Sequence, residues 1–170
     1  MTTYAIDLGH GCNFDGGAVG ILKEENVINV VGRLVINKLL QLGHEVIEVR
    51  PVTANSTRHS LQQRCNTANA FKADVFVSIH ANKHKGQAHG TEVFAISTKG
   101  RALAAKVLRN ICSLGFFSRG VKNGSHLFVL KNTAMVAILI ELFFLDSTKD
   151  VALYNAEKLA TAIVEGLTAA

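Results

Sequence analysis

The chain has 170 residues, 48% of them apolar, and carries 18 basic against 13 acidic side chains. This length predicts one domain with a hydrophobic core of its own. The longest apolar run, residues 134–145, contains Glu141 and is much shorter than the roughly 20 residues of a membrane helix, which excludes a membrane span. The formal net charge of +5 favours an anionic partner, and charge alone does not decide between nucleic acid and a cell-wall surface.

The start of the chain and its cysteines bear on where the protein is made. Residues 1–7 run straight into a strand pattern, with no basic leader, long apolar segment or cleavage site, so no signal peptide is predicted and cytoplasmic synthesis is expected. Cys12, Cys65 and Cys112 are odd in number and widely spaced, which fits neither a disulfide framework nor a zinc ribbon. Reduced, mostly buried thiols are expected.

The first half of the chain alternates predicted strands and helices. Residues 4–9 form a strand pattern, and a glycine-rich turn follows up to residue 17. Apolar residues recur at helical spacing over residues 24–42, and Gly43 supplies a C-terminal stop. A second strand is predicted at residues 46–49 and a second helix at residues 60–71.

The second half continues the alternation. Residues 74–79 are almost continuously apolar, which is typical of a strand buried on both faces. A strand at residues 90–97, a helix at 99–112 and a turn over 115–124 come next. A short strand at 127–130, a core strand at 136–141 and an amphipathic helix at 154–167 complete the chain. This order predicts an α/β sheet with helices on both faces, in one domain over residues 1–170.

Three predicted strands end in a residue that can bind a metal or move a proton. The first ends at His10, the third at His80 and the last at Glu141, while Glu24 opens the first helix. Active sites of open α/β sheets gather beyond the carboxyl ends of the strands. Two histidines and a glutamate with an open fourth position make a usual catalytic zinc site, and a further carboxylate can accept a proton from water there.

Each of these residues also has an ordinary interpretation. A histidine after a glycine is often a turn residue, His80 can cap its strand, and Glu24 and Glu25 suit the first turn of a helix. Glu141 is different, because burying a carboxylate within the apolar residues 138–144 costs several kcal/mol unless a partner such as a metal relieves it. The glycines of residues 9–17 fit neither the dinucleotide-binding nor the phosphate-loop pattern.

Short stretches across nearly the whole chain together resemble the type-3 N-acetylmuramoyl-L-alanine amidases. They are residues 6–11 (Ile-Asp-Leu-Gly-His-Gly), 15–20 (Asp-Gly-Gly-Ala-Val-Gly), Glu24 with its helix, Arg64, residues 68–69 (Ala-Asn), 78–82 (Ser-Ile-His-Ala-Asn), 119–122 (Arg-Gly-Val-Lys), 129–130 (Val-Leu) and 140–145 (Ile-Glu-Leu-Phe-Phe-Leu).

The resemblance implies a mixed, mostly parallel sheet of about six strands and one zinc ion per chain. It implies peptidoglycan as the partner, with no nucleic acid, and hydrolysis of the amide bond between N-acetylmuramic acid and L-alanine. Glu141 would be the catalytic acid/base, and Arg64 and Asn69 are expected to brace the fold. A monomer is expected. The implied zinc ligands are His10, Glu24 and His80.

The chain departs from the family pattern at three positions. Cys12 stands where a third glycine is usual, two residues from His10, so its thiol could approach a metal. Phe143 replaces the glycine usual after Glu-Leu, and Val136 replaces a proline. The last two changes lie near Glu141 in the chain, and none of the three removes a group with an implied chemical role.

Two other functions stay open at this point. One is another zinc hydrolase of the cell wall, a carboxypeptidase or a deacetylase. The other is a wall-binding or nucleic-acid-binding module without catalysis. A wall amidase without a predicted signal peptide or wall-binding repeats is typical of a phage or prophage lysin that is released through a holin, and the sequence fits this origin. It also fits a catalytic domain excised from a longer secreted protein.

Overall fold

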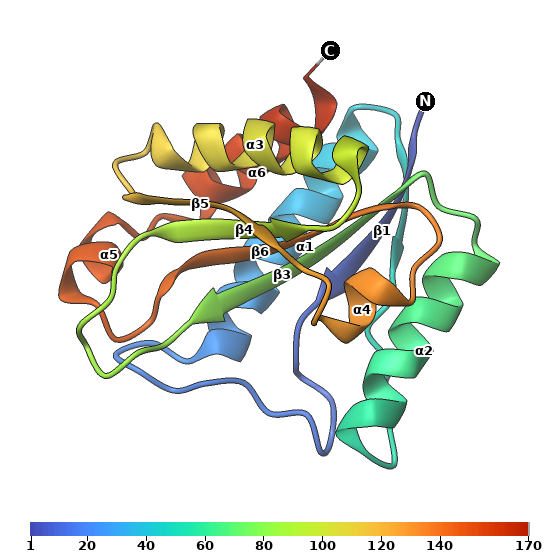
Figure 1. The fold of residues 1–170 in the computed structure, drawn as a ribbon, viewed down its shortest axis with the longest axis horizontal. Coiled ribbons are helices and arrows are strands. Elements are labelled where there is room, and N and C mark those ends of the chain that lie inside the picture. The colour runs from blue at the N-terminus through green and yellow to red at the C-terminus, as the bar shows by residue number, and fades with distance from the viewer. Residues whose placement is uncertain (170) are drawn as a thin grey trace.

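Six strands form one sheet in the computed structural model, which describes residues 1–169 (Figure 1). Four parallel strands, β1, β2, β3 and β6, occupy one side, β4 runs antiparallel to β6, and β5 runs parallel to β4. This confirms the expected mixed, mostly parallel sheet of a single α/β domain. In spatial order the strands are β2 (Glu45–Glu48), β1 (Thr3–Leu8), β3 (Val75–Asn82), β6 (Val136–Phe144), β4 (Thr91–Ala95) and β5 (Ser118–Asn123).

Helices cover both faces of the sheet, as the alternation of elements predicted (Figure 1). One face packs against α1 (Glu24–Gln41), α3 (Thr98–Cys112) and α6 (Ala156–Thr168). The other packs against α2 (Thr57–Ala70) and the short α4 (Phe128–Lys131), while α5 (Thr148–Leu153) follows β6. Within residues 1–169, no helix combines the length and the apolar character that crossing a membrane requires.

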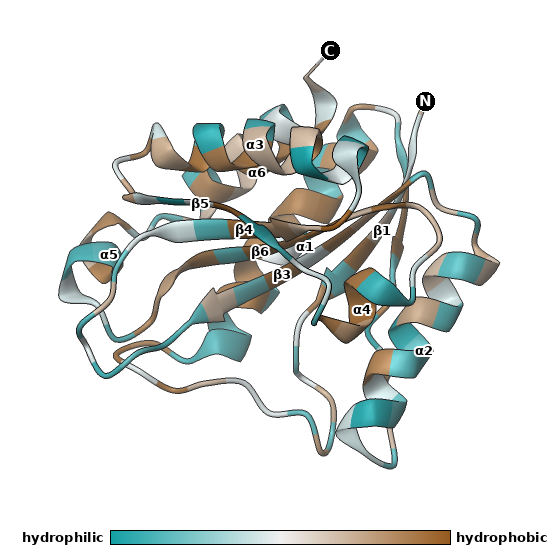
Figure 2. Ribbon diagram, viewed as in Figure 1, coloured by the Kyte–Doolittle hydropathy of each residue, from teal (hydrophilic) through white to brown (hydrophobic). Residues whose placement is uncertain are grey.

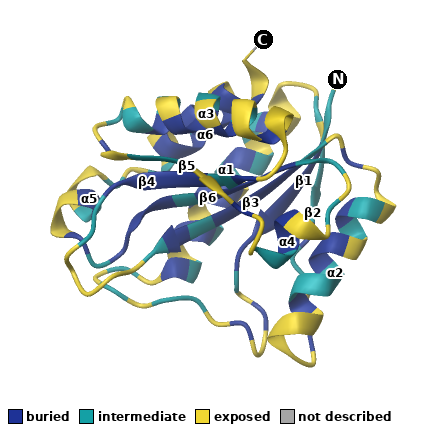
Figure 3. Ribbon diagram, viewed as in Figure 1, coloured by how far each residue is buried: buried dark blue, intermediate teal, exposed yellow. Residues whose placement is uncertain are grey.

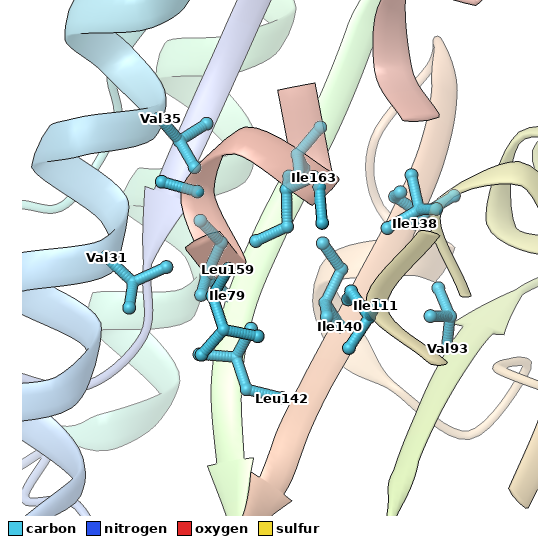
Figure 4. Packing of buried hydrophobic residues seen from close by; sticks show 14 of the residues in the cluster. Val31, Val35, Ile79, Val93, Ile111, Ile138, Ile140, Leu142, Leu159 and Ile163 are labelled. Atoms are coloured by element: carbon cyan, nitrogen blue, oxygen red, sulfur yellow. The ribbon is translucent and has the colours of Figure 1, made fainter. Parts of the chain in front are cut away.

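The larger hydrophobic core lies between the sheet and the three helices α1, α3 and α6 (Figures 3 and 4). Alternate residues in the middle of β6 point into it, namely Ile138, Ile140 and Leu142, and Ile163 of α6 meets them. The intervening Leu139 belongs to the smaller core on the α2 side. Both faces of β6 are therefore apolar over most of its length, which is the pattern of a strand buried on both sides.

Helix α2 packs in a different way. Most of its residues are hydrophilic (Figure 2), and its fully buried positions include Ser60 and Arg64 beside the apolar Cys65 and Ala68. A buried guanidinium is costly without partners. Arg64 is therefore expected to have hydrogen-bond partners at the end of β1.

One predicted strand is wrong, and one real strand was missed. Residues 128–131 are helix α4 rather than part of a strand at 127–130, because a short apolar run alone does not distinguish the two. The missed strand is β5, which lies in the segment predicted to be a turn. Its sequence, Ser-Arg-Gly-Val-Lys-Asn, is mostly polar because β5 is an edge strand with no fully buried residue. Helix α5 was also missed; Ser147 caps its start by accepting from the amide of Asp150.

Candidate metal centre

His10, Glu24 and His80 come together at one place in the fold. His10 follows the end of β1, Glu24 is the first residue of α1, and His80 lies on β3. Each offers a ligand atom, and these atoms all lie within 4.8 Å of one another. The side chains of the two histidines are 24% and 18% exposed, so the cluster can be reached from solvent. Three residues separated by 70 positions in the chain thus form one candidate metal site.

The carboxylate of Glu24 stands between the two imidazoles. Its Oε1 atom lies 3.3 Å from His10 Nε2 and 3.2 Å from His80 Nδ1. The backbone amides of Ala18 and Ala81 also donate to this carboxylate, at 2.7 and 3.1 Å. Burial would raise the pKa of Glu24, but the two histidines hold it well below its usual range. Glu25 takes no part in the cluster and instead accepts from the amide of Gly17.

The glycine before His10 makes room for His80. A Cβ atom on Gly9 would lie 2.4 Å from the His80 ring, so a side chain there would displace the ring. His10 itself has a φ of 56°, in the left-handed region that few non-glycine residues adopt. The glycine-rich turn therefore shapes the backbone around the two histidines.

Asp15 and Arg64 hold His10 from behind. Asp15 Oδ1 lies 3.0 Å from His10 Nδ1, and its Oδ2 accepts from Ser60 Oγ at 2.8 Å and Arg64 Nη2 at 3.3 Å. Arg64 Nη2 also donates to the His10 carbonyl at 2.9 Å, which secures the left-handed backbone there. When Asp15 accepts the Nδ1 proton, Nε2 of His10 is left to face Glu24. Burial would lower the pKa of His10, but Asp15 and Glu24 outweigh it and raise the pKa to about 10.

The sequence predicted that Arg64 braces the fold, and it assigned no role to Asp15. Arg64 does brace the fold, because its Nη1 bonds to Asp7, whose other oxygen accepts from Ser78 on β3. Asn69 braces it as well, through bonds to the segment between α4 and β6. Asp15 stands in a stretch that resembles the amidase family, and only its contact with His10 distinguishes it from an ordinary turn aspartate.

Glu141 lies beside the cluster on the neighbouring strand. It is the register partner of His80, so both residues sit within their strands rather than at the strand ends as predicted. Its Oε2 atom is inaccessible and has no hydrogen-bond partner among residues 1–169. Burial, with the charges of Glu24 and Glu92, raises the pKa of Glu141 to about 7 against the opposing effect of His80 and His10. A carboxyl with a pKa near neutrality suits proton transfer.

The unusual residues near the site leave its groups in place. Phe143 is fully buried on the opposite side of the sheet, where its ring stacks on Phe116 at 5.8 Å. A register shift between β3 and β6 just after Glu141 turns this side chain away from the site. Val136 simply opens β6. The Cys12 thiol donates to Asn13, and Cys12 is not part of the metal-site cluster found among residues 1–169.

The cluster has the composition that a catalytic zinc centre requires. Two imidazoles and one carboxylate suit Zn²⁺, and Glu141 lies on the neighbouring strand as the register partner of His80. An α/β sheet that carries these groups toward the carboxyl-terminal side of its parallel strands defines a candidate metal-dependent hydrolase.

Comparison with known proteins places this hydrolase in a family. Residues 5–170 match the family model described as N-acetylmuramoyl-L-alanine amidase, and the chain belongs to that family. It is 31% identical to the endolysin of Bacillus phage SPP1, over 95% of this chain and 61% of the relative. It is 33% identical to the N-acetylmuramoyl-L-alanine amidase LytC of Bacillus subtilis, over 96% of this chain but only 34% of that protein.

A solved structure supports the same assignment. The catalytic domain of CwlV, an N-acetylmuramoyl-L-alanine amidase from Bacillus (Paenibacillus) polymyxa var. colistinus, superposes with a TM-score of 0.85 at 31% identity. The match covers 99% of this chain and 97% of that domain. The fold described above is therefore that of an amidase catalytic domain.

Proposed function

We propose that this chain is a zinc-dependent peptidoglycan amidase that hydrolyses the bond between N-acetylmuramic acid and L-alanine. Residues 1–170 would act as one catalytic domain, as a monomer, on the bacterial cell wall. The observation that carries the proposal is the His10–Glu24–His80 cluster with the unpartnered carboxylate of Glu141 beside it, in a chain of the amidase family. The proposed zinc ligands are His10 Nε2, His80 Nδ1 and the Glu24 carboxylate.

In this proposal each residue has one chemical task. A zinc ion at the cluster would supply Lewis acidity, polarising the amide carbonyl and lowering the pKa of water. Glu141 accepts the proton of the attacking water and returns a proton to the departing L-alanine nitrogen. Asp15 keeps the His10 ring oriented, with Nε2 free to bind. No side chain needs to form a covalent bond with the substrate.

Product analysis tests the proposed reaction. Purified peptidoglycan digested by the zinc-loaded chain should release peptides with a new free amino group on L-alanine, and mass spectrometry should find intact stem peptides separated from the glycan. Release of acetate would indicate a deacetylase, and loss of a C-terminal residue would indicate a carboxypeptidase. Either of these products without a free L-alanine amine contradicts the proposal, and so does an absence of any product.

A prediction for Asp15 tests the orientation of His10. Asp15→Asn removes the charge that faces the Nδ1–H group and should weaken zinc binding by ~10- to 100-fold. Competition with a chromogenic chelator measures the affinity, and thermal unfolding checks that the variant is folded. Asp74→Asn is the matched control, because Asp74 bonds to the backbone of Thr3 at the other end of the strands. A folded Asp15→Asn protein with normal zinc affinity would show that Asp15 is only structural.

A further inference from the structure

A row of polar side chains continues from the metal-site cluster to the edge of the sheet. His80 on β3 pairs with Glu141 on β6, and Glu141 pairs with Glu92 on β4. Arg119 on β5 follows Ser118, the register partner of Thr91, and bonds to Glu92. Neighbouring strands lie about 4.8 Å apart, so two strand spacings place the backbones of Arg119 and Glu141 roughly 10 Å from each other. None of the roles proposed above uses Glu92 or Arg119.

The guanidinium of Arg119 is held at one end. Its Nε donates to Glu92 Oε2 at 3.1 Å, and its central carbon lies 4.9 Å from the centre of the Phe144 ring. The other oxygen of Glu92 accepts from Asn82 Nδ2 at 3.2 Å. The side chain of Glu92 is only 9% exposed, whereas that of Arg119 is 33% exposed. The buried carboxylate of Glu92, which accepts two hydrogen bonds, and the ring of Phe144 thus fix the direction of the partly exposed Arg119 guanidinium.

The other end of the guanidinium is available to a ligand. Among the described residues, neither terminal nitrogen of Arg119 donates to a protein acceptor; its bond to Glu92 is made by Nε alone. Two terminal nitrogens of one guanidinium match the two oxygens of a carboxylate, in a geometry that lysine cannot reproduce. Burying Glu92 close to Glu141 is unfavourable electrostatically, since each is a carboxylate. Fixing the position of Arg119 gives Glu92 a use at this location.

We infer that Arg119 binds a carboxylate of the substrate peptide, that of the residue following the L-alanine whose amide is cleaved. The inference rests on the proposed function. One residue spans at most about 3.6 Å, so the second residue of the peptide reaches roughly 7 Å beyond the cleaved bond. That length, with the reach of the arginine side chain, covers the separation between Glu141 and Arg119. The chain therefore prefers substrates in which this second residue carries a free α-carboxylate over substrates that carry an α-amide.

Two matched substrates test this preference. N-acetylmuramoyl-L-alanyl-D-glutamate and N-acetylmuramoyl-L-alanyl-D-isoglutamine differ only in that α-carboxylate or α-amide. The zinc-loaded wild-type chain should hydrolyse the acid with a kcat/KM ~10- to 100-fold above that of the amide, chiefly through KM. Arg119→Gln should abolish this preference by lowering kcat/KM for the substrate with the α-carboxylate alone. Arg119→Lys should restore part of the preference. Arg109→Gln, an exposed position on α3, should leave the ratio unchanged.

A binding measurement separates this inference from the proposed function. Calorimetric titration of Glu141→Gln protein with each ligand, with and without Arg119→Gln, reports affinity without turnover. Tighter binding of the acid that disappears with Arg119→Gln supports the inference even if neither compound is hydrolysed, and only the absence of hydrolysis counts against the proposed function. Equal affinities for the acid and the amide in the presence of Arg119 would overturn the inference. So would an Arg119→Gln variant that loses the same affinity for both ligands, and Arg119 would then be only a structural partner of Glu92.

Discussion

Glu141→Gln is expected to lower peptidoglycan hydrolysis by ~10²- to 10⁴-fold while the protein keeps its zinc. Glutamine has the shape of glutamate but cannot accept the proton, and Glu141 is outside the His10–Glu24–His80 cluster. Turnover on purified peptidoglycan, together with zinc content by mass spectrometry, measures both quantities. Normal hydrolysis by the variant would remove Glu141 from the acid/base role. Loss of zinc along with activity would make it a metal ligand instead.

The same substitution should stabilise the metal-free protein at high pH. Burial raises the pKa of Glu141 from its ordinary value of 4.5 to about 7, so the native state holds a proton there that the unfolded chain releases. Stability from this group is therefore lost as the pH rises from about 4.5 to 7 and stays lost above that range. Glu141→Gln should raise the unfolding temperature at pH 8 and change it little at pH 4. Equal effects at both values would show that Glu141 carries no buried charge.

Removal of the metal is expected to abolish activity, and added zinc should restore it. The purified chain should contain one zinc with nitrogen and oxygen ligands at roughly 2.0–2.2 Å, as X-ray absorption spectroscopy can measure. Glu24→Gln should lose zinc affinity, since its carboxylate is the anionic group between the two histidines. Glu25→Gln, the adjacent residue outside the cluster, is the matched control and should bind zinc normally.

His80→Ala should likewise lose the metal, and the variants should still fold. Zinc content, far-ultraviolet circular dichroism and turnover together separate loss of metal from loss of structure. Full hydrolysis after confirmed removal of zinc would refute the metal-dependent mechanism. Equal zinc affinity in Glu24→Gln and Glu25→Gln would refute the assignment of Glu24 as a ligand.

The sequence by itself determined the class of fold and indicated His10, Glu24 and His80, which the structure brings together, with Glu141 as the proposed acid/base. Buried parallel strands have near-continuous apolar segments, and helices have periodic ones, so most of the elements could be predicted. The convergence of His10, His80 and Glu141 could be predicted too, because the parallel strands that carry them end at the same side of the sheet. Glu141 was conspicuous as a carboxylate within an apolar strand.

Other features depended on the tertiary structure. The edge strand β5 has no apolar alternation to reveal it, because neither of its faces is fully buried. The four apolar residues from Leu127 to Leu130 lie where either a strand or a helix can bury them, and packing against the smaller core selected the helix. Local sequence carries little information at such positions, since the decisive contacts come from residues far along the chain.

The surroundings of the site were also decided by tertiary structure alone. Asp15 and Arg64 lie 49 positions apart, and only the packing of α2 against the end of β1 brings them together behind His10. Arg119 and Glu92 meet because β5 pairs with β4 at the edge of the sheet. Sequence patterns identify groups that can do chemistry by their type and burial. The hydrogen bonds that orient those groups join distant segments, and they form only when the whole sheet is assembled.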